Sequence, residues 1–555
     1  MQLSQHLAGS PPVRPRSFLS RAAAVAAAIV ALPIIAIVWI AVSGGDDSWR
    51  HVMANVVPRA TTRTLQLLLL TGLVSAAFGI LAAWLVTSFE FPLRRMLSIV
   101  LVLPLAIPSY LAAYAFGEFA DFTGPLQTGY RALFGYQSSR DYSFPDIRSM
   151  GGAVLVLSSV LYPYVYLSCR SVFLMQGRAA ADVARTLGAG PLKVFWQIQI
   201  PMARPAIMIG VTLAMMETLN DIGAVQFLGI NTLTFAVYDT WLNRGSLSGA
   251  TQIAVVMLAI VALLIWLERV ARRSQRFTSN KTTAAVHDAV KRRLKGPAAL
   301  AATLLCALPV VSGFIIPVFV LGGFALKRLD NYLDPRLLSA LSNSILVSLG
   351  TAVIAVILGF LLSYAARCDR SSGTAVAGRI ASLGYGVPGT VLAIGVLIPL
   401  ATFDNALDGV LRSQFGISTG LLLSGSGFAI IYACTARFMT MAEGTLDAGF
   451  QKVSPHLDMA ARTLGRTQAQ ALSSVLLPNM RPAIMIAGLL VFIETMKELS
   501  ATMLLRPFNF NTLATLVYED ASRAKIEDAS VPAMIIIAAG LIPVLLVSRS
   551  LDKQG

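Results

Sequence analysis

Long apolar stretches dominate this chain of 555 residues and restrict it to one class of fold. A helix needs about 20 mostly apolar residues to cross the hydrocarbon core of a bilayer. We expect an all-α polytopic membrane protein with about 12 transmembrane helices, because only helices and closed barrels satisfy their backbone groups in lipid. The twelve predicted spans are roughly 22–43, 64–88, 97–118, 152–175, 205–229, 250–268, 297–323, 342–366, 379–402, 420–443, 483–505 and 532–549.

The composition agrees with this fold and excludes other classes of protein. Hydrophobic residues make up 56% of the chain and charged residues 13%, which is too apolar for an ordinary soluble enzyme or a disordered chain. In so apolar a chain the net charge of +16 favours contact with a membrane surface, and we expect no nucleic-acid partner. If both termini are cytoplasmic, most of the lysine and arginine residues fall in cytoplasmic loops. The positive-inside rule therefore predicts cytoplasmic termini.

Potential metal ligands are dispersed along the chain. The four histidines form no cluster, and the four cysteines have no C-x-x-C spacing, so the sequence predicts neither a metal site nor a disulfide framework. The cysteines are Cys169, Cys306, Cys368 and Cys434.

The chain contains an internal repeat. Residues 64–79 match residues 344–359, and "NTLTFAVYD" from Asn231 matches "NTLATLVYE" from Asn511, with the same offset of 280 residues. This offset predicts two parallel six-helix repeats, related by a pseudo-two-fold axis along the membrane normal, with a pathway between them. The predicted segments are an N-terminal cytoplasmic segment 1–21, a first module 22–268, a basic cytoplasmic linker 269–296, a second module 297–549 and a cytoplasmic tail 550–555.

A second pair of similar segments follows the fourth span of each repeat. These cytoplasmic loops are "ADVARTLGAGPLKVFWQIQIPMARPAI" (181–207) and "MAARTLGRTQAQALSSVLLPNMRPAI" (459–484). We expect each loop to contain a short helix that lies across the cytoplasmic face and ends at a glycine in the left-handed conformation. A proline then restarts the chain near the next span. The glycines are Gly188 and Gly465, and the prolines are Pro201 and Pro478.

Both loops resemble the E-A-A-x-x-x-G-x(9)-I-x-L-P motif of the membrane subunits of binding-protein-dependent ABC importers. In that family the loop forms a coupling helix that docks into a groove of the ATP-binding subunit. The first loop matches at Asp182, Val183, Ala184, Gly188, Ile198, Ile200 and Pro201, and also contributes Arg185. The second loop matches at Met459, Ala460, Ala461, Gly465, Val475, Leu477 and Pro478, and also contributes Arg462. Asp182 and Met459 replace the family's glutamate.

The resemblance extends over almost the whole chain. The segments "METLNDIGAVQFLGINTLTFAVYDTWLNRG" from Met216 and "ETMKELSATMLLRPFNFNTLATLVYE" from Glu494 resemble the fused ferric-iron importer permeases. This implies the type I importer permease fold, in a bacterial inner (cytoplasmic) membrane. It also implies a permease that moves its substrate, expected to be ferric iron, from a periplasmic binding protein into the cytoplasm. Related fused permeases serve phosphonate and thiamine, which remain alternatives.

The sequence contains no G-x-x-x-x-G-K-[ST] loop, so ATP is not bound here by that route. The resemblance therefore implies a non-catalytic subunit with two ATP-binding partner subunits. These partners hold ATP and Mg²⁺, and we expect no cofactor in this chain.

Four acidic residues lie well inside predicted spans, away from the span ends. Glu217 and Asp221 are spaced for one helical face, and so are Glu494 and Glu498 in the second repeat. Intramembrane acids cost several kcal/mol unless they face the bundle interior or water, so they are candidates for a translocation pathway. A lining of carboxylates would suit a hard cation such as Fe(III). The alternative is structural, in which the acids cap a broken helix.

A proton-coupled secondary transporter with 12 helices in two parallel halves is the rival from another transport class. That class would carry basic, glycine-containing loops between its second and third spans. Here the loop between the second and third spans is short (residues 89–95), and the duplicated motif follows the fourth span instead. A membrane enzyme or scaffold lacks support, because no catalytic cluster is evident.

Overall fold

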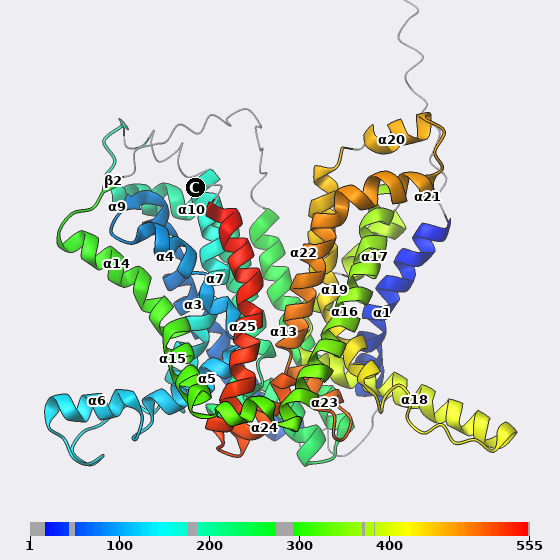
Figure 1. Cartoon of the computed structure of the whole chain (residues 1–555), viewed down its shortest axis with the longest axis horizontal. Helices are drawn as coiled ribbons and strands as arrows, with labels where there is room; N and C mark the ends of the chain where they lie inside the picture. Colours follow the sequence, from blue (N-terminus) through cyan, green and yellow to red (C-terminus); the bar gives the residue numbers. More distant parts are fainter. Residues whose placement is uncertain are drawn as a thin grey trace, which may run out of the picture. The chain divides into compact units, whose positions relative to one another are not determined.

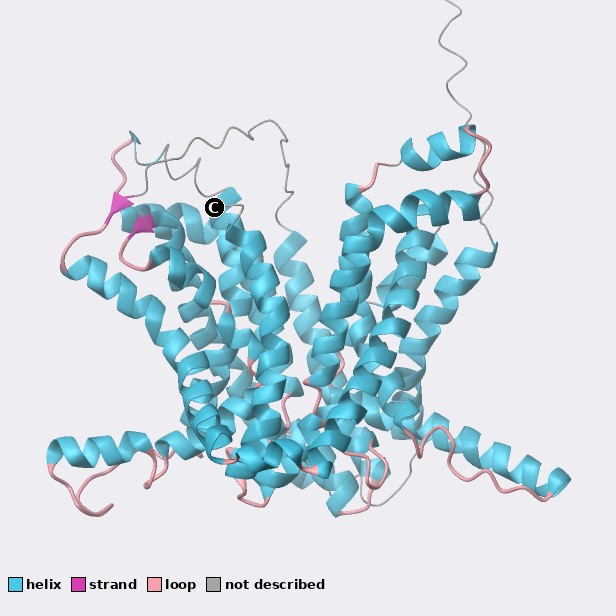
Figure 2. Ribbon diagram, viewed as in Figure 1, coloured by secondary structure: helices cyan, strands magenta, loops and turns pink. Residues whose placement is uncertain are grey.

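The protein is described by a computed structural model that covers residues 17–43, 50, 52–175, 184, 186–273, 292–368, 372–381, 383–454 and 456–552. It consists of two compact units, each described by itself below. The larger unit comprises Ile37–Ile345, Pro388–Ile394 and Met496–Gly555, and the smaller unit comprises Met1–Ala36, Leu346–Val387 and Gly395–Thr495. The secondary structure of the described part consists of helices joined by loops, with one pair of two-residue strands, as Figure 2 shows.

The larger unit contains most of the first repeat and the ends of the second (Figure 1). Long apolar helices pack against one another here, with α3 against α7 and α10, and α25 against α15 and α24. Strands β1 and β2 form a parallel pair in which Phe89 lies opposite Arg292. Its elements are η1 (Val52–Val56), α3 (Val57–Ser88), β1 (Phe89–Glu90), α4 (Arg94–Val100), η2 (Leu103–Ala106), α5 (Ser109–Ala120), α6 (Pro125–Phe134), α7 (Met150–Met175), α9 (Pro191–Val194), η3 (Phe195–Gln199), α10 (Ile200–Asn220), α11 (Gly223–Phe227), α12 (Leu233–Tyr238), η4 (Asp239–Asn243), α13 (Leu247–Arg273), β2 (Arg292–Arg293), α14 (Pro297–Val310), η5 (Val311–Ile315), α15 (Ile316–Lys327), η6 (Leu329–Leu333), the start of α16 (Pro335–Cys368), α23 (Ser500–Leu505), α24 (Leu513–Ser522) and α25 (Ile526–Asp552).

The smaller unit is built around α19. The hydroxyl of Tyr432 in α19 donates to the carbonyl of Ile29 in α1 at 2.9 Å, and the guanidinium of Arg367 in α16 donates to the carbonyl of Phe450 at the end of α19, also at 2.9 Å. Its elements are most of α1 (Ser17–Ser43), the rest of α16, α17 (Ser372–Ala381), η7 (Gly384–Gly386), most of α18 (Gly389–Phe415), α19 (Gly427–Lys452), α20 (His456–Thr463), α21 (Gln468–Ala471), η8 (Leu472–Leu476) and α22 (Leu477–Met496).

The repeat predicted from the sequence is visible in matching elements and matching hydrogen bonds. Helices α7 and α19 have the same length of 26 residues and occupy equivalent positions in the two halves of the chain. The amide of Leu233 donates to the hydroxyl of Thr64 at 2.9 Å, and the equivalent amide of Leu513 donates to the hydroxyl of Ser344 at 2.7 Å. In both repeats, this bond fastens the start of a short helix to the long second span.

All twelve predicted spans fall on helices, but fewer than twelve are long and apolar enough to cross a bilayer. Among the described residues, ten helices meet that requirement, and eleven do if the pair Arg94–Ala106 and Ser109–Phe134, bent by 98°, counts as one span. Helix α19, which begins at Gly427 and contains most of the predicted span 420–443, is not among them, since Arg437 and Glu443 reduce its apolar character.

Four predicted spans are broken rather than continuous. The third and ninth break before Pro108 and Pro388, whose rings cannot continue a helix with the preceding turn. The fifth and eleventh break around Asp221 and Glu498. Each repeat is broken at the same two places, so the breaks belong to the fold that the two repeats share.

Candidate functional sites: coupling loops and broken helices

The two glycines of the cytoplasmic loops are in the left-handed conformation predicted for them. Gly188 has φ of 83° and Gly465 has φ of 81°. In each loop, the amide that follows the glycine closes the end of the preceding helical turn, as in a Schellman motif. The bonds run from Ala189 N to Ala184 O at 3.0 Å and from Arg466 N to Ala461 O at 3.1 Å.

The short helix predicted in each loop is seen in the second copy. It is α20, which contains Ala460, Ala461 and the backbone of Arg462, and Figure 1 shows it lying crosswise to α22. Ala461 is buried and Ala460 is exposed, so only the latter lies on the free surface. In the first copy, Ala184 is half-buried, and Asp182, Val183 and Arg185 lie outside the described residues.

Pro201 and Pro478 are the second residues of α10 and α22, as expected for prolines near a helix start. The helical structure nevertheless begins earlier in both repeats, because the π-helical turns η3 and η8 connect it to α9 and α21. A π turn shifts the hydrogen-bond register and accommodates a residue without an N–H group. A continuous helix therefore runs from each loop into the next span, over Pro191–Asn220 and Ala469–Met496.

Sequence reasoning missed the residues at the tips of these loops. Leu187 and Leu464, which directly precede the glycines, each expose 82% of their surface. Large apolar side chains exposed at equivalent points of two loops are candidates for a partner contact. The signal was present in the "ARTLG" shared by both loops, where leucine is the one large apolar residue.

We expect valine at Gly188 or Gly465 to impair coupling between ATP hydrolysis and transport while membrane insertion survives. An added Cβ would meet no atom at either position, so the cost is one of backbone conformation. A left-handed non-glycine residue costs about 1–2 kcal/mol, which would move the leucine at the tip. Transport and ATPase activity in proteoliposomes measure the effect.

The matched control is Gly190→Val, in the same loop. Gly190 is equally free of neighbours but has an ordinary φ of −67°. Equal losses in the Gly190 and Gly188 variants would show that bulk, and not the helix end, is responsible.

The acid pairs do not lie on continuous helical faces, so that expectation is wrong. Helix α10 ends at Asn220 and α22 ends at Met496, which leaves Asp221 and Glu498 in the breaks. Both acids are buried and act as caps, in agreement with the structural alternative. The carboxylate of Asp221 accepts from Ala224 N at 2.7 Å, and that of Glu498 accepts from Ala501 N at 2.9 Å.

The four helix breaks meet in the larger unit. The side-chain oxygen of Asn220 accepts from Gly389 N at 2.6 Å, and the backbone carbonyl of Asn220 accepts from the hydroxyl of Ser500 at 2.8 Å. The hydroxyl of Ser109 donates to Asp221. We name these residues the break cluster: Ser109, Asn220, Asp221, Gly389, Glu498 and Ser500. Polar groups at the break of one span thus bind groups from another broken span. Non-helical backbone inside a membrane requires such partners.

Two hydroxyl groups beside the break cluster are buried without a protein partner in the described part of the chain. They belong to Tyr110 and Thr390, each one residue after a cluster member, at equivalent positions of the two repeats. Buried polar groups normally find a partner, and ordered water is a common one.

The other acid of each pair lies within a helix and is partly exposed. Glu217 lies in α10 of the larger unit, and Glu494 lies in α22 of the smaller unit. Their proposed contact with a passing substrate stays a prediction. Among the residues that the structure describes, no three His, Cys, Asp or Glu side chains are grouped closely enough to hold a metal ion.

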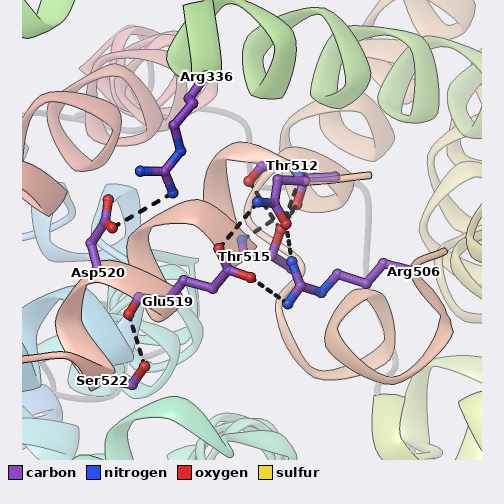
Figure 3. A network of polar contacts seen from close by, with 8 residues as sticks. Arg336, Arg506, Thr512, Thr515, Glu519, Asp520 and Ser522 are labelled. Carbon is purple, nitrogen blue, oxygen red and sulfur yellow. Dashed lines mark hydrogen bonds and ion pairs between the residues drawn. The ribbon is translucent and has the colours of Figure 1, made fainter. Parts of the chain in front are cut away.

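The repeated "NTL" motif has a structural role. Thr232 and Thr512 cap the helices that follow them, and the acids at the ends of the motif form ion pairs, Asp239 with Arg244 at 2.9 Å and Glu519 with Arg506 at 2.6 Å. Figure 3 shows the second network, in which Arg336 also approaches Asp520 at 4.0 Å. Burial raises the pKa of the Asp520 carboxyl, an effect that Arg336 opposes.

Comparison with known proteins gives related sequences for one module and for the whole chain. The family model described as the binding-protein-dependent transport system inner membrane component matches residues 75–276. The Fe(3+)-transport system permease protein FbpB 2 of Haemophilus influenzae is 24% identical over 493 residues, which cover 88% of this chain and 89% of that protein.

Two single-module relatives are more similar but shorter. The molybdenum transport system permease protein ModB of Escherichia coli is 30% identical over 237 residues, which cover 41% of this chain and 96% of that protein. The sulfate transport system permease protein CysW of Escherichia coli is 30% identical over 225 residues, which cover 38% of this chain and 74% of that protein. The chain therefore belongs to the family of inner-membrane components of binding-protein-dependent transport systems, as a non-catalytic, multi-pass permease subunit of an ABC importer.

Proposed function

We propose that this permease imports ferric iron, which it receives from a substrate-binding protein and releases into the cytoplasm. The observation that carries this proposal is the match with the iron-transport permease, which extends across both modules. The molybdenum and sulfate permeases each match less than half of this chain. Membership of the family argues against the proton-coupled carrier, since it implies an ATPase partner.

We further propose that both termini are cytoplasmic and that two ATP-binding subunits dock on the two loops, one on each. These partners would bind ATP and Mg²⁺. Leu187 and Leu464 would provide an apolar contact at each tip. The repeated geometry of the two loops suits two copies of the same partner.

The mechanical link between loop and pathway is the continuous helix after each loop. Pro191–Asn220 has 30 residues, so at 1.5 Å per residue it extends about 45 Å from the first loop to the break cluster. Movement of a loop on ATP binding would be carried along this helix to Asn220, which holds Gly389. We propose that the break cluster closes the passage at rest and opens when ATP binding moves the loops.

Uptake into proteoliposomes tests the substrate. The permease is reconstituted with its ATP-binding subunits, and radioactive ferric iron is supplied on the cognate binding protein, because free Fe(III) hydrolyses. We expect iron uptake that requires both ATP and the binding protein. ATP-driven uptake of molybdate, sulfate, phosphonate or thiamine without iron uptake would overturn the iron assignment and leave the permease class intact.

A further inference from the structure

Each repeat carries a helix with a returning loop, here called a hairpin, at the end of its unit opposite the coupling loop (Figure 1). The first hairpin comprises residues 121–149 and contains α6. The second comprises residues 403–426 and contains the C-terminal part of α18. Each occurs after the third span of its repeat, and their sequences are unlike.

In the first hairpin, the polar side chains of α6 are bound to the chain's own backbone and side chains. Arg131 donates to the carbonyl of Phe122 at 2.7 Å, and Gln127 donates to that of Ala120 at 2.8 Å. The hydroxyl of Tyr142 donates to Gln127 at 2.6 Å. The ring of Tyr130 packs against four others, those of Phe134, Tyr136, Tyr142 and Phe144.

Three large apolar side chains of α6 remain exposed. Leu133 exposes 78% of its surface, Phe134 57% and Leu126 39%. The spacing of these residues places them on one stripe of the helix. In Figure 1, α6 projects away from the helices α3, α5 and α7 of the same unit.

The second hairpin also binds its polar groups internally and exposes apolar side chains, but it uses different residues. Asp404 accepts from the amide of Ser424 at 2.8 Å, and Asp408 accepts from that of Thr419 at 2.7 Å. The two acids also accept from the amides of Leu423 and Gly420, so four amides of the loop are satisfied within the hairpin. The exposed apolar residues are Phe403, Val410, Phe415, Ile417, Leu421 and Leu422, each exposing at least 50% of its surface.

We propose that both hairpins lie in the interface of the bilayer leaflet opposite the coupling loops, with their apolar stripes among the lipid chains. An apolar stripe with internally satisfied polar groups suits an interfacial helix, and unsatisfied backbone groups would be costly there. Continuity with the membrane supports lipid as the occupant. Helix α18 is itself a candidate span, and α6 continues the bent pair that begins at Arg94.

The charges of the hairpins define the kind of lipid contact. The first hairpin has three arginines and three aspartates, and the second has one arginine and two aspartates. Neither has a basic excess, so attraction to anionic headgroups does not contribute. Apolar burial alone drives the contact, and it should be independent of lipid charge.

Spin labels test the proposal in the full chain, reconstituted with its ATP-binding subunits after the four native cysteines are replaced by alanine. Labels are placed at L133C and V410C on the apolar side, with R140C and N405C as exposed controls on the polar side of each hairpin. Collision with oxygen, which partitions into lipid, is compared with collision with a water-soluble nickel chelate. We expect oxygen to dominate at positions 133 and 410, and nickel to dominate at positions 140 and 405, in phosphatidylcholine with or without phosphatidylglycerol.

Three results would overturn the proposal. The first is equal access of nickel to all four labels. The second is protection of positions 133 and 410 only after the binding protein is added, which would make the hairpins a protein-docking surface. The third is burial that requires phosphatidylglycerol, since the contact would then be electrostatic. F134C and L422C serve as second positions if either first variant fails to insert.

Discussion

A permease in which Leu187 and Leu464 are both replaced by aspartate is expected to lose its ATP-binding subunits on purification. Each leucine exposes 82% of its surface in the free chain, beside a rigid helix end. Burying a leucine contributes about 1.5–3 kcal/mol. Losing two such contacts, and placing a charge in each groove, should weaken assembly by a factor of about 100 or more. Copurification and ATPase activity of the membrane complex measure the loss.

Leu333→Asp is the matched control. Leu333 exposes 81% of its surface, but it lies in η6 between the first and second spans of the second repeat, on the side opposite the loops in the predicted topology. This variant should keep its ATP-binding subunits. Full retention of the subunits by the double variant would show that the loop tips are not the coupling contact.

The features predicted well from the sequence are those that depend on local patterns. Long apolar segments predicted the helices, and the constant offset between similar segments predicted the matching elements of the two repeats. The conformations of Gly188 and Gly465 followed from the residue type, because glycine is the residue that most readily ends a helix with positive φ. These inferences need no knowledge of which helix packs on which.

The breaks at Asp221 and Glu498 could not be predicted from spacing alone. Glutamate and aspartate four residues apart fit one face of a continuous helix equally well. What ends the helix is tertiary, since Ser109 and Gly389 come from other spans. A local signal existed in the Asn220–Asp221 pair followed by Gly223, because such residues start helices and interrupt them.

The loop leucines were missed for a different reason. Apolar residues inside an apolar sequence are assigned to the core by default, and only the structure shows that these two are exposed. Helix α19 shows the reverse case. Its hydropathy is too low for a membrane span, although it has the same length as α7. The repeat identifies α19 where its composition alone does not.

Alanine at Gly389 is expected to raise the ATPase activity that the complex shows without its binding protein. An added Cβ would lie 2.7 Å from a carboxylate oxygen of Glu498 and 3.0 Å from the amide of Ala501. Because that carboxylate caps α23 through the same amide, neither atom can shift without loosening the other. Overpacking of this kind costs about 1–3 kcal/mol, and each 1.4 kcal/mol changes an equilibrium tenfold. If the break cluster closes the passage at rest, the activity should rise about tenfold.

Gly409→Ala controls for the effect of adding a methyl group to the same helix. Gly409 also lies in α18, but no atom is within 4 Å of an added Cβ there, so alanine should stabilise the helix by about 1 kcal/mol and leave the activity unchanged. Asn220→Ala should also weaken the break cluster, since it removes the acceptor of the Gly389 amide without adding bulk. Leaving that amide unsatisfied costs about 1–3 kcal/mol, a loss similar to that in the Gly389 variant.

The direction of the change separates a gate from a structural joint. A gate that is weakened at rest opens more often, so ATPase activity without the binding protein rises while the purified complex stays assembled and monodisperse. A joint that only holds the fold together would lower the thermal midpoint and all activities in parallel. A parallel loss in both the Gly389 and Asn220 variants would therefore remove the break cluster from the transport cycle and leave it a structural feature of the two broken repeats.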